Sequence, residues 1–427
     1  MPTSSPFSTE EMDQGLSIGN VPPKIIRAHV PSRHRSSDRT DHVKADVIHL
    51  PGLNGIRAIA AIGVVLSHTT MSLDQFGLNP YVFGARPDGQ IRGLDLAPFG
   101  VSMFFALSGF LITYLLLVER KRTSDINVKN FYIRRVLRIH PLYYGYLLIA
   151  VAVIFTARLV HPENGLLFYY VFFAANVPGI MERPFPLIGH YWSLGVEEQF
   201  YAFHPWLVKK AEKVGRTILI VTIGFLLLKF GCRYIQSEYG ISWPYNTVDY
   251  TRFSCMLIGA LGGICYFQQR DRILRLATSW IVQSICWITI VLVILNRFHI
   301  ASIVDQEIIS TVTVAIILGQ ITKKHRIVNL DTEAFDFLGK ISYGIYVLHP
   351  LVIYLLTLIP WDVNAPLPVR YIIVFVGVLS ASIFTAHFSY KHFEKSFLRI
   401  KTRFSAVPTN SSKHVSDILE SPTLPGI

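Results

Sequence analysis

Apolar runs of about 20 residues dominate the sequence and constrain its fold more than any other feature. A helix of that length crosses the ~30 Å hydrocarbon core of a bilayer, because it rises ~1.5 Å per residue. Only 16% of the residues are charged, whereas soluble domains carry about 25%. The sequence therefore predicts an all-α, polytopic transmembrane helical bundle of about ten spans, at residues 56–73, 97–118, 141–158, 192–208, 217–235, 251–267, 278–296, 306–322, 337–359 and 369–390.

Basic residues gather in every second connection between these runs, and this placement predicts the topology. The basic connections are residues 120–138, 209–216, 270–275, 323–326 and 391–403. Cytoplasmic loops carry such an excess of Lys and Arg, so we expect a multi-pass inner-membrane protein with both termini in the cytoplasm. These loops account for most of the net charge of +12, which argues against a nucleic-acid partner.

The two ends of the chain differ from its apolar centre. Residues 1–49 and 404–427 are polar, and we expect them to form disordered cytoplasmic tails around one membrane domain, residues 50–403. We expect neither a cleavable signal peptide nor an appended soluble catalytic domain. Any chemistry is therefore expected among the helices.

One apolar segment is too short for a crossing helix. The stretch "LLFYYVFFAANV" at residues 166–177 has 12 residues and is followed by Pro178. That length predicts an interfacial or re-entrant helix, here on the outer side.

The first apolar run, "LPGLNGIRAIAAIGVVLSHTT" at residues 50–70, carries an arginine and a histidine. Arg57 and His68 are eleven residues apart, which places them about 20° apart around a helix and ~16 Å apart along it. Ionisable groups inside a membrane are costly and indicate function by default. Alternatively, Arg57 only anchors the end of the helix, and His68 is a buried residue bonded to a carbonyl group.

The stretch "FYIRRVLRIHPLYY" at residues 131–144 places three arginines just before the third span. Arg134 and Arg138 share one helix face, and Arg135 is three residues before Arg138. Guanidinium groups bind phosphate with two parallel hydrogen bonds, so this group is suited to a phosphorylated donor from the cytosol. The alternative is an ordinary basic loop that only sets topology.

The stretch "HYWSLGVEEQFYAFHP" at residues 190–205 places two carboxylates inside the fourth span. Glu197 lies roughly 8 Å below the outer surface, near the depth counted for His68 from the other side. A carboxylate that orients an imidazole is a common way to make a general base, so Glu197 or Glu198 is expected to support His68. The alternative is that one of the two is interfacial and solvated.

Small residues and the missing motifs complete the pattern. Ser108 and Gly109, and a GxxxG at Gly259 and Gly263, predict close helix packing. The four cysteines show neither CxxC nor Cys/His spacing. No Walker loop, dinucleotide fingerprint or HExxH occurs, so no metal site and no resident cofactor are expected.

Taken together, the motifs resemble the acyltransferase-3 family of integral membrane O-acyltransferases. The resemblance covers about residues 50–390 and rests on five motifs in order: "GLNGIRAIAAIGVVLSH", "GVSMFFALSGFLITYLL", "FYIRRVLRIHPLYY", "HYWSLGVEEQFY" and "LGKISYGIYVLHP". Asn54 and Ser102 depart from the aspartates that are frequent in the family, and His140 stands where an apolar residue is more usual.

The resemblance implies a ten-helix acyltransferase domain, a cytosolic acyl-CoA donor and an acceptor hydroxyl, commonly on a glycan. It implies that Arg57, Arg135 and Arg138 bind acyl-CoA and that His68 is the general base, supported by Glu197 or Glu198. The expected function is O-acyl transfer, most often of acetyl, to an extracytoplasmic or lipid-linked carbohydrate. The alternative is a transporter or flippase for a polyprenyl-linked glycan, which would explain the intramembrane charges as a translocation path.

Overall fold

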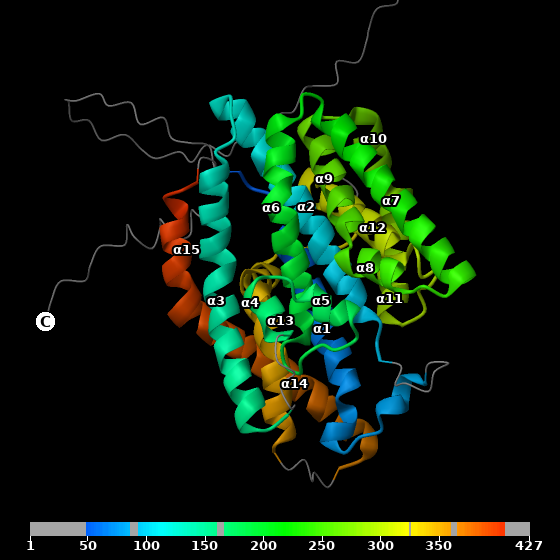
Figure 1. Cartoon of the computed structure of the whole chain (residues 1–427), viewed down its shortest axis with the longest axis vertical. Helices are drawn as coiled ribbons and strands as arrows, with labels where there is room; N and C mark the ends of the chain where they lie inside the picture. The colour runs from blue at the N-terminus through cyan, green and yellow to red at the C-terminus, as the bar shows by residue number, and fades with distance from the viewer. Residues whose placement is uncertain (1–47, 86–92, 160–165, 324–325, 360–364, 406–427) are drawn as a thin grey trace, which may run out of the picture.

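The structure is a computed structural model that describes residues 48–85, 93–159, 166–323, 326–359 and 365–405. The predicted tails lie almost entirely outside these residues. Within them the chain forms helices and no β-strand (Figure 1). Each of the ten predicted runs coincides with a helix: α1 (Leu53–Met71), α2 (Leu96–Thr123), α3 (Val128–Thr156), α6 (Trp192–Lys210), α7 (Val214–Tyr239), α9 (Phe253–Phe267), α11 (Trp280–Ile294), α12 (Asp305–Thr322), α13 (Glu333–Thr357) and α14 (Leu367–Ser389).

Fewer helices than ten have the length and composition of a membrane span. Among the described residues, α2, α3, α7, α13 and the continuous helical stretch Leu367–Thr402 qualify. The pair of α10 (Asp271–Ala277) and α11, bent by 51°, gives a sixth. Helices α9 and α11 have 15 residues each and reach only ~22 Å. The protein is thus an all-helical bundle with five candidate spans, and the count of ten stays a prediction.

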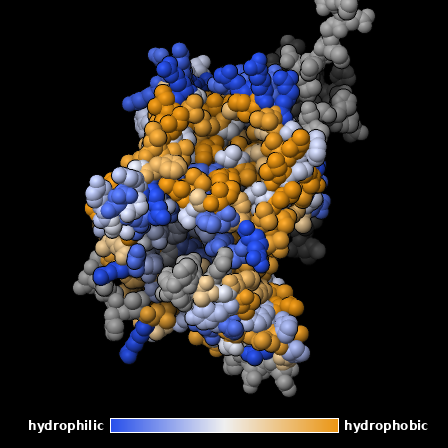
Figure 2. Space-filling view, turned by 90° about the vertical axis from the view of Figure 1, so that its right-hand side faces the viewer, coloured by the Kyte–Doolittle hydropathy of each residue, from blue (hydrophilic) through white to orange (hydrophobic). Residues whose placement is uncertain are grey.

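The surface of the bundle carries the apolar band that a bilayer requires. Figure 2 shows such a band, with hydrophilic side chains beyond one end of it and a hollow on the other side. Exposed apolar side chains lie along α7 and α11, for example Leu227 and Ile288. An apolar surface of this extent is typical of a protein whose solvent is lipid.

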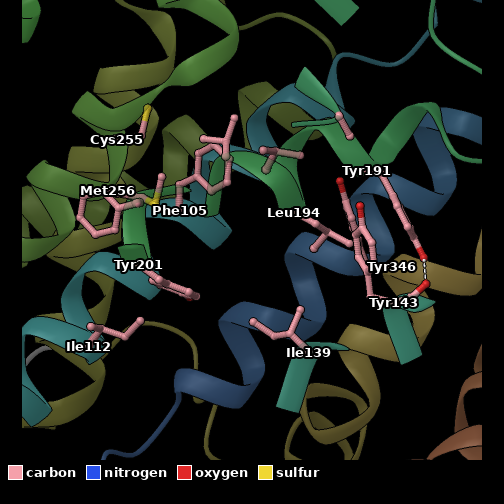
Figure 3. Close-up of a cluster of buried hydrophobic side chains, with 14 of the residues drawn as sticks. Phe105, Ile112, Ile139, Tyr143, Tyr191, Leu194, Tyr201, Cys255, Met256 and Tyr346 are labelled. Atoms are coloured by element: carbon pink, nitrogen blue, oxygen red, sulfur yellow. Dashed lines mark hydrogen bonds between the residues drawn. The ribbon is translucent and has the colours of Figure 1, made fainter. Parts of the chain in front are cut away.

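Helix α2 lies at the centre of the bundle and packs most closely against α9. The two backbones nearly touch: a Cβ atom at Gly109 would lie 1.9 Å from the carbonyl oxygen of Met256, and one at Gly259 would lie 2.0 Å from that of Ala106. The prediction of small residues at a helix contact is therefore confirmed. Aromatic side chains fill the neighbouring core, where the Tyr191 hydroxyl donates to the carbonyl of Tyr143 at 2.9 Å (Figure 3).

The short elements lie at the ends of the long helices. The stretch at residues 166–177 holds α4 (Leu166–Val171) and the start of α5 (Asn176–Ile180), and neither helix has the length of a span. Its place at the outer interface stays a prediction. After α14 a π-helical turn, η4 (Tyr390–Glu394), leads into α15 (Lys395–Thr402). Helix α15 lies against α3 (Figure 1), which brings the end of the described chain beside the third span.

Candidate active site

Helix α1 positions His68, and its partner comes from α13. The two helices pack so closely that a Cβ atom at Gly339 would lie 2.2 Å from the carbonyl oxygen of Asn54. Further along the same contact, Nδ1 of His68 lies 2.7 Å from Nε2 of His349. The two imidazole rings are stacked, with centroids 5.0 Å apart. His349 is fully buried, and His68 is partly buried.

The hydrogen bonds of His349 decide which nitrogen of each ring carries a hydrogen. Nδ1 of His349 lies 2.7 Å from the carbonyl oxygen of Tyr346 and 3.2 Å from that of Ile345. A carbonyl oxygen only accepts, so this nitrogen is the donor. In the neutral ring Nε2 is then the acceptor, and Nδ1 of His68 must donate to it. This tautomer leaves the lone pair of His68 on Nε2, where it can accept a proton.

A third histidine completes this group, which we call the histidine cluster (His68, His190 and His349). His190 lies in the turn η3 (Gly189–Tyr191), and its ring centroid is 5.3 Å from that of His349. Its Nε2 donates to the carbonyl of Val347 at 3.2 Å, whereas its buried Nδ1 has no hydrogen-bond partner among the described residues. The three rings come from α1, η3 and α13, which are far apart in the sequence.

The arginines predicted for donor binding lie together at the N-terminal end of α1. The charges of Arg135 and Arg138 both act on Arg57, and Lys401 of α15 interacts with all three. We call these four residues the arginine cluster. The Nη1 group of Arg57 donates to Oδ1 of Asn54 at 3.1 Å. The structure therefore brings together the predicted arginines and adds a lysine that sequence reasoning counted only as a topological charge.

The arginine beside this cluster has a different environment. Arg134 donates to a carboxylate oxygen of Glu119 at 3.1 Å and to the carbonyl of Phe404 at 2.7 Å. It therefore ties α3 to the end of α2 and to the segment after α15. Arg134 is one helix turn from Arg138, but its guanidinium is occupied by these two contacts and has a structural role.

The two glutamates of α6 lie apart from His68. Glu197 accepts hydrogen bonds from the hydroxyls of Ser108 and Tyr201, and its charge acts on Arg57 and Arg138. Glu198 lies 3.6 Å from Nε2 of His140.

Within the described part of the chain, neither glutamate of α6 contacts His68, whose partner is His349. Equal depth along two helices does not make them neighbours, and α1 packs against α2 and α13. Sequence reasoning gave His190 no role, although it begins one of the five motifs.

Comparison with known proteins finds relatives that match most of the chain. The chain is 26% identical over 403 residues to the O-acetyltransferase OatA of Staphylococcus aureus (strain MRSA252), covering 87% of this chain and 61% of that protein. It is 26% identical over 377 residues to the protein of the same name from strain NCTC 8325 / PS 47, covering 81% and 57%. The chain thus spans about three-fifths of the length of these relatives. No solved structure matches the chain.

The match to a family model covers most of the chain. A model described as an acyltransferase domain aligns with residues 50–387, which include the histidine cluster and the three arginines of the arginine cluster. The chain therefore belongs to the acyltransferase-3 family.

Proposed function

We propose that this protein is a membrane O-acyltransferase that moves an acyl group, here acetyl, from cytosolic acyl-CoA to a hydroxyl of an extracytoplasmic or lipid-linked carbohydrate. Family membership and the names of the relatives support O-acetyl transfer as the reaction class. The donor, the acceptor and the side from which each enters are part of the proposal. Ten spans with both termini in the cytoplasm belong to it as well.

The observation that carries the proposal is the hydrogen bond between His68 and His349. It fixes the ring of His68 and leaves its Nε2 as the proton acceptor. General bases need a fixed orientation, which the bond to His349 gives to the ring of His68, and His68 is only partly buried. His349 is thus the positioning residue in this proposal, a role that we had expected of a glutamate.

The arginine cluster supplies the donor site. Its four cations lie at the end of α1 opposite His68, and they are suited to the phosphate groups of acyl-CoA. Arg57 and His68 lie on the same side of one helix, ~16 Å apart along its axis. An extended donor held at Arg57 would therefore run along α1 with its thioester towards His68.

The transfer itself needs no covalent enzyme intermediate. Nε2 of His68 takes the proton of the acceptor hydroxyl while the hydroxyl oxygen attacks the carbonyl carbon of the thioester. The C–S bond breaks as the new ester forms, and the thiolate leaves with the electrons of that bond. The imidazolium returns the proton to the thiolate, so that the histidine is neutral again and free CoA is released.

The decisive experiment replaces His68 by glutamine in the purified, membrane-reconstituted protein. Glutamine keeps a hydrogen-bonding side chain but takes up no proton at neutral pH, so release of CoA thiol from acetyl-CoA should fall by about 10²–10⁴-fold. His204 is the matched control, because it is a buried histidine of α6 that bonds Thr113 at 2.8 Å outside the cluster. His204→Gln should retain turnover.

Two results would contradict the proposal. An active His68→Gln protein would remove the general-base role. Parent protein that releases no CoA thiol in the presence of glycan would contradict acyl transfer and favour the transporter alternative, which has no thioester to break.

The side of donor entry is tested with introduced cysteines. Arg216→Cys, in the first turn of α7, should be protected from an impermeant thiol reagent in intact cells, and Ser302→Cys, before α12, should be labelled. Both positions are outside the arginine and histidine clusters. The reverse pattern would place the donor site on the outer face and overturn that part of the proposal.

A further inference from the structure

A large cavity opens at the end of the bundle that the topology predicts to be outside. It has a volume of about 1150 Å³ and lies between the start of α2, the start of α6, helix α8 (Trp243–Thr251) and the connection from α11 to α12. Figure 2 views this side of the molecule, where the surface is hollowed beside the apolar band.

Both aromatic rings and polar groups line the cavity. Its lining includes Trp192, Tyr250, Phe298, Asp95 and Arg252. The Asp95 carboxylate accepts no hydrogen bond from its own helix start, although its backbone N–H donates to Asn296 at 3.0 Å. Flat aromatic faces beside carboxylate and guanidinium groups suit the apolar faces and the hydroxyl edges of sugar rings.

The floor of the cavity is held in one conformation. Arg252 joins α8 to α9 with φ +42°, a value that is uncommon for a residue with a side chain. Its guanidinium lies 5.1 Å from the ring centre of Trp192 and donates to the carbonyl of Pro98 at 3.0 Å and to Gln306 at 3.2 Å. Strained residues persist where the surroundings fix them, and they are frequent at ligand sites.

Both walls of the cavity connect to the histidine cluster. On one wall, Asp95 follows Leu94, whose carbonyl accepts from Ser67, the neighbour of His68. On the other wall, Trp192 lies two residues after His190 in the chain. Among the described residues, none of the three histidines lines the cavity itself, but both walls adjoin segments that contain or contact residues next to the histidine cluster.

The second wall is also linked to His349, through Ser193, the residue that follows Trp192. Ser193 bonds the hydroxyl of Tyr346, and the ring of Tyr346 lies 6.0 Å from that of His349. The wall at Trp192 is thus joined to the positioning residue by direct contacts.

Charge and size select the class of ligand. Three carboxylates line the cavity, from Asp95, Asp249 and Asp305, and two guanidinium groups, from Arg252 and Arg297. Two of the carboxylates are already paired, Asp249 with Lys229 at 3.4 Å and Asp305 with His299 at 2.8 Å. The lining thus carries no excess of positive charge that would attract an anionic glycan. The volume exceeds the ~300–1,000 Å³ that is typical of small-molecule pockets, so the cavity has room for more than one sugar ring.

We propose that this cavity is the acceptor site and that it selects a neutral oligosaccharide over anionic glycans and over single sugars. The inference rests on the proposed function, because it presumes acetyl transfer. Trp192 would stack against one sugar ring, and Asp95 would accept from sugar hydroxyls, while the hydroxyl to be acetylated points towards His68.

The test uses the reconstituted full-length protein, acetyl-CoA with a labelled acetyl group, and polysaccharide from the cell envelope of the producing organism. The polysaccharide is split into neutral and anionic fractions, and one portion of each is hydrolysed partially to oligosaccharides and another completely to single sugars. Parent protein should label the neutral oligosaccharides best. Trp192→Ala should raise the KM for them at least tenfold and leave the dissociation constant of acetyl-CoA unchanged.

The matched control is Trp243→Ala, since Trp243 is an exposed tryptophan at the start of α8 outside the cavity lining. It should leave the acceptor KM unchanged. Because Trp192 also packs against Phe105 and Tyr250, a second variant avoids the core: Ser302→Cys, at an exposed position of the lining. Coupling a polyethylene-glycol maleimide to it should lower transfer well below that of the same variant before coupling, and the same reagent should leave the parent active.

Each outcome separates the two proposals. If the parent labels no fraction and releases no CoA, the proposed function fails. If the parent is active but Trp192→Ala and the coupled Ser302→Cys protein keep the parent acceptor KM, the cavity is not the acceptor site and the function stands. Labelling confined to the anionic fraction or to single sugars overturns the selectivity.

Discussion

Two groups of charged side chains lie among the helices, and they differ in how far each balances its own charge. In the first, which we call the lysine group, Lys229 of α7 lies 3.0 Å from Glu307 of α12 and 3.4 Å from Asp249 of α8. Ser254 of α9 donates to Glu307 at 2.8 Å. A buried cation is here matched by carboxylates from two other helices, and all four helices are joined.

The arginine cluster has the opposite character. Within the described residues, no ion pair joins any of its four cations to a carboxylate. The acidic groups whose charges act on Arg138 are Glu197, which already accepts from two hydroxyls, and Glu394, which accepts from Ser389 at 3.2 Å. Gathering like charges in a membrane protein is costly unless an anion is to be bound. A group whose charges are paired thus indicates a structural role, and a group of like charges without ion pairs indicates a binding site for an anion.

The largest effect is expected on stability, when the lysine group loses its cation. Lys229→Met leaves Glu307 buried without its cation, which typically costs about 3–5 kcal/mol, so the unfolding temperature in detergent should drop sharply. Lys229→Met combined with Glu307→Leu should recover much of the loss, because a buried pair is often replaceable by apolar residues. If Lys229→Met unfolded at the same temperature as the parent, the lysine group would not stabilise the fold.

A smaller effect, on ligand binding rather than on stability, is expected in the unbalanced cluster. Arg138→Ala removes hydrogen bonds to a charged group, worth about 1.5–3 kcal/mol, so the KM for acyl-CoA should rise about 10- to 100-fold. Arg138→Lys should restore only part of this, since a point charge replaces a two-pronged donor poorly. The unfolding temperature should not fall, because a like-charge contact is relieved.

Arg134→Lys is the control for this experiment. Arg134 is on the same helix but is already bound to Glu119, so its replacement should affect stability and leave the KM for acyl-CoA unchanged. Equal kinetics for Arg138→Ala and the parent would mean that the arginine cluster only sets topology.

The sequence predicts the positions of the long helices well, but it does not predict how many of them cross the membrane. Apolar runs locate all ten long helices, because burial in lipid or in a core both require them. The two environments leave the same apolar signature over 15 residues, as in α9, whose residues lie largely in the core. Only the tertiary arrangement separates a central helix from a lipid-facing one.

The candidate site divides in the same way. Arg135 and Arg138 of α3 lie together in the arginine cluster, because residues three apart share a helix face. Arg134, which its spacing places on the face of Arg138, pairs with Glu119 instead. The partner of His68 is His349, which is 281 positions away, and no local sequence pattern pairs α1 with α13. The expectation that a glutamate supports His68 rested only on their similar depth in the membrane, and depth does not identify which helices are neighbours.

Lys401 shows the same limit, and it gives the smallest expected effect. It belongs to the basic stretch 391–403, which charge counting assigns to topology, yet α15 folds back along α3 and places it among the arginines. Its side chain is partly buried, while Arg399 of the same helix is exposed. Because Lys401 adds one point charge to a site that already holds three guanidinium groups, its loss should cost roughly 1 kcal/mol, or about a fivefold rise in the KM for acyl-CoA. Arg399→Met removes the same charge from the same helix and should leave this KM unchanged. Equal effects of Lys401→Met and Arg399→Met would reduce the role of α15 to a general attraction between a basic helix and an anionic donor.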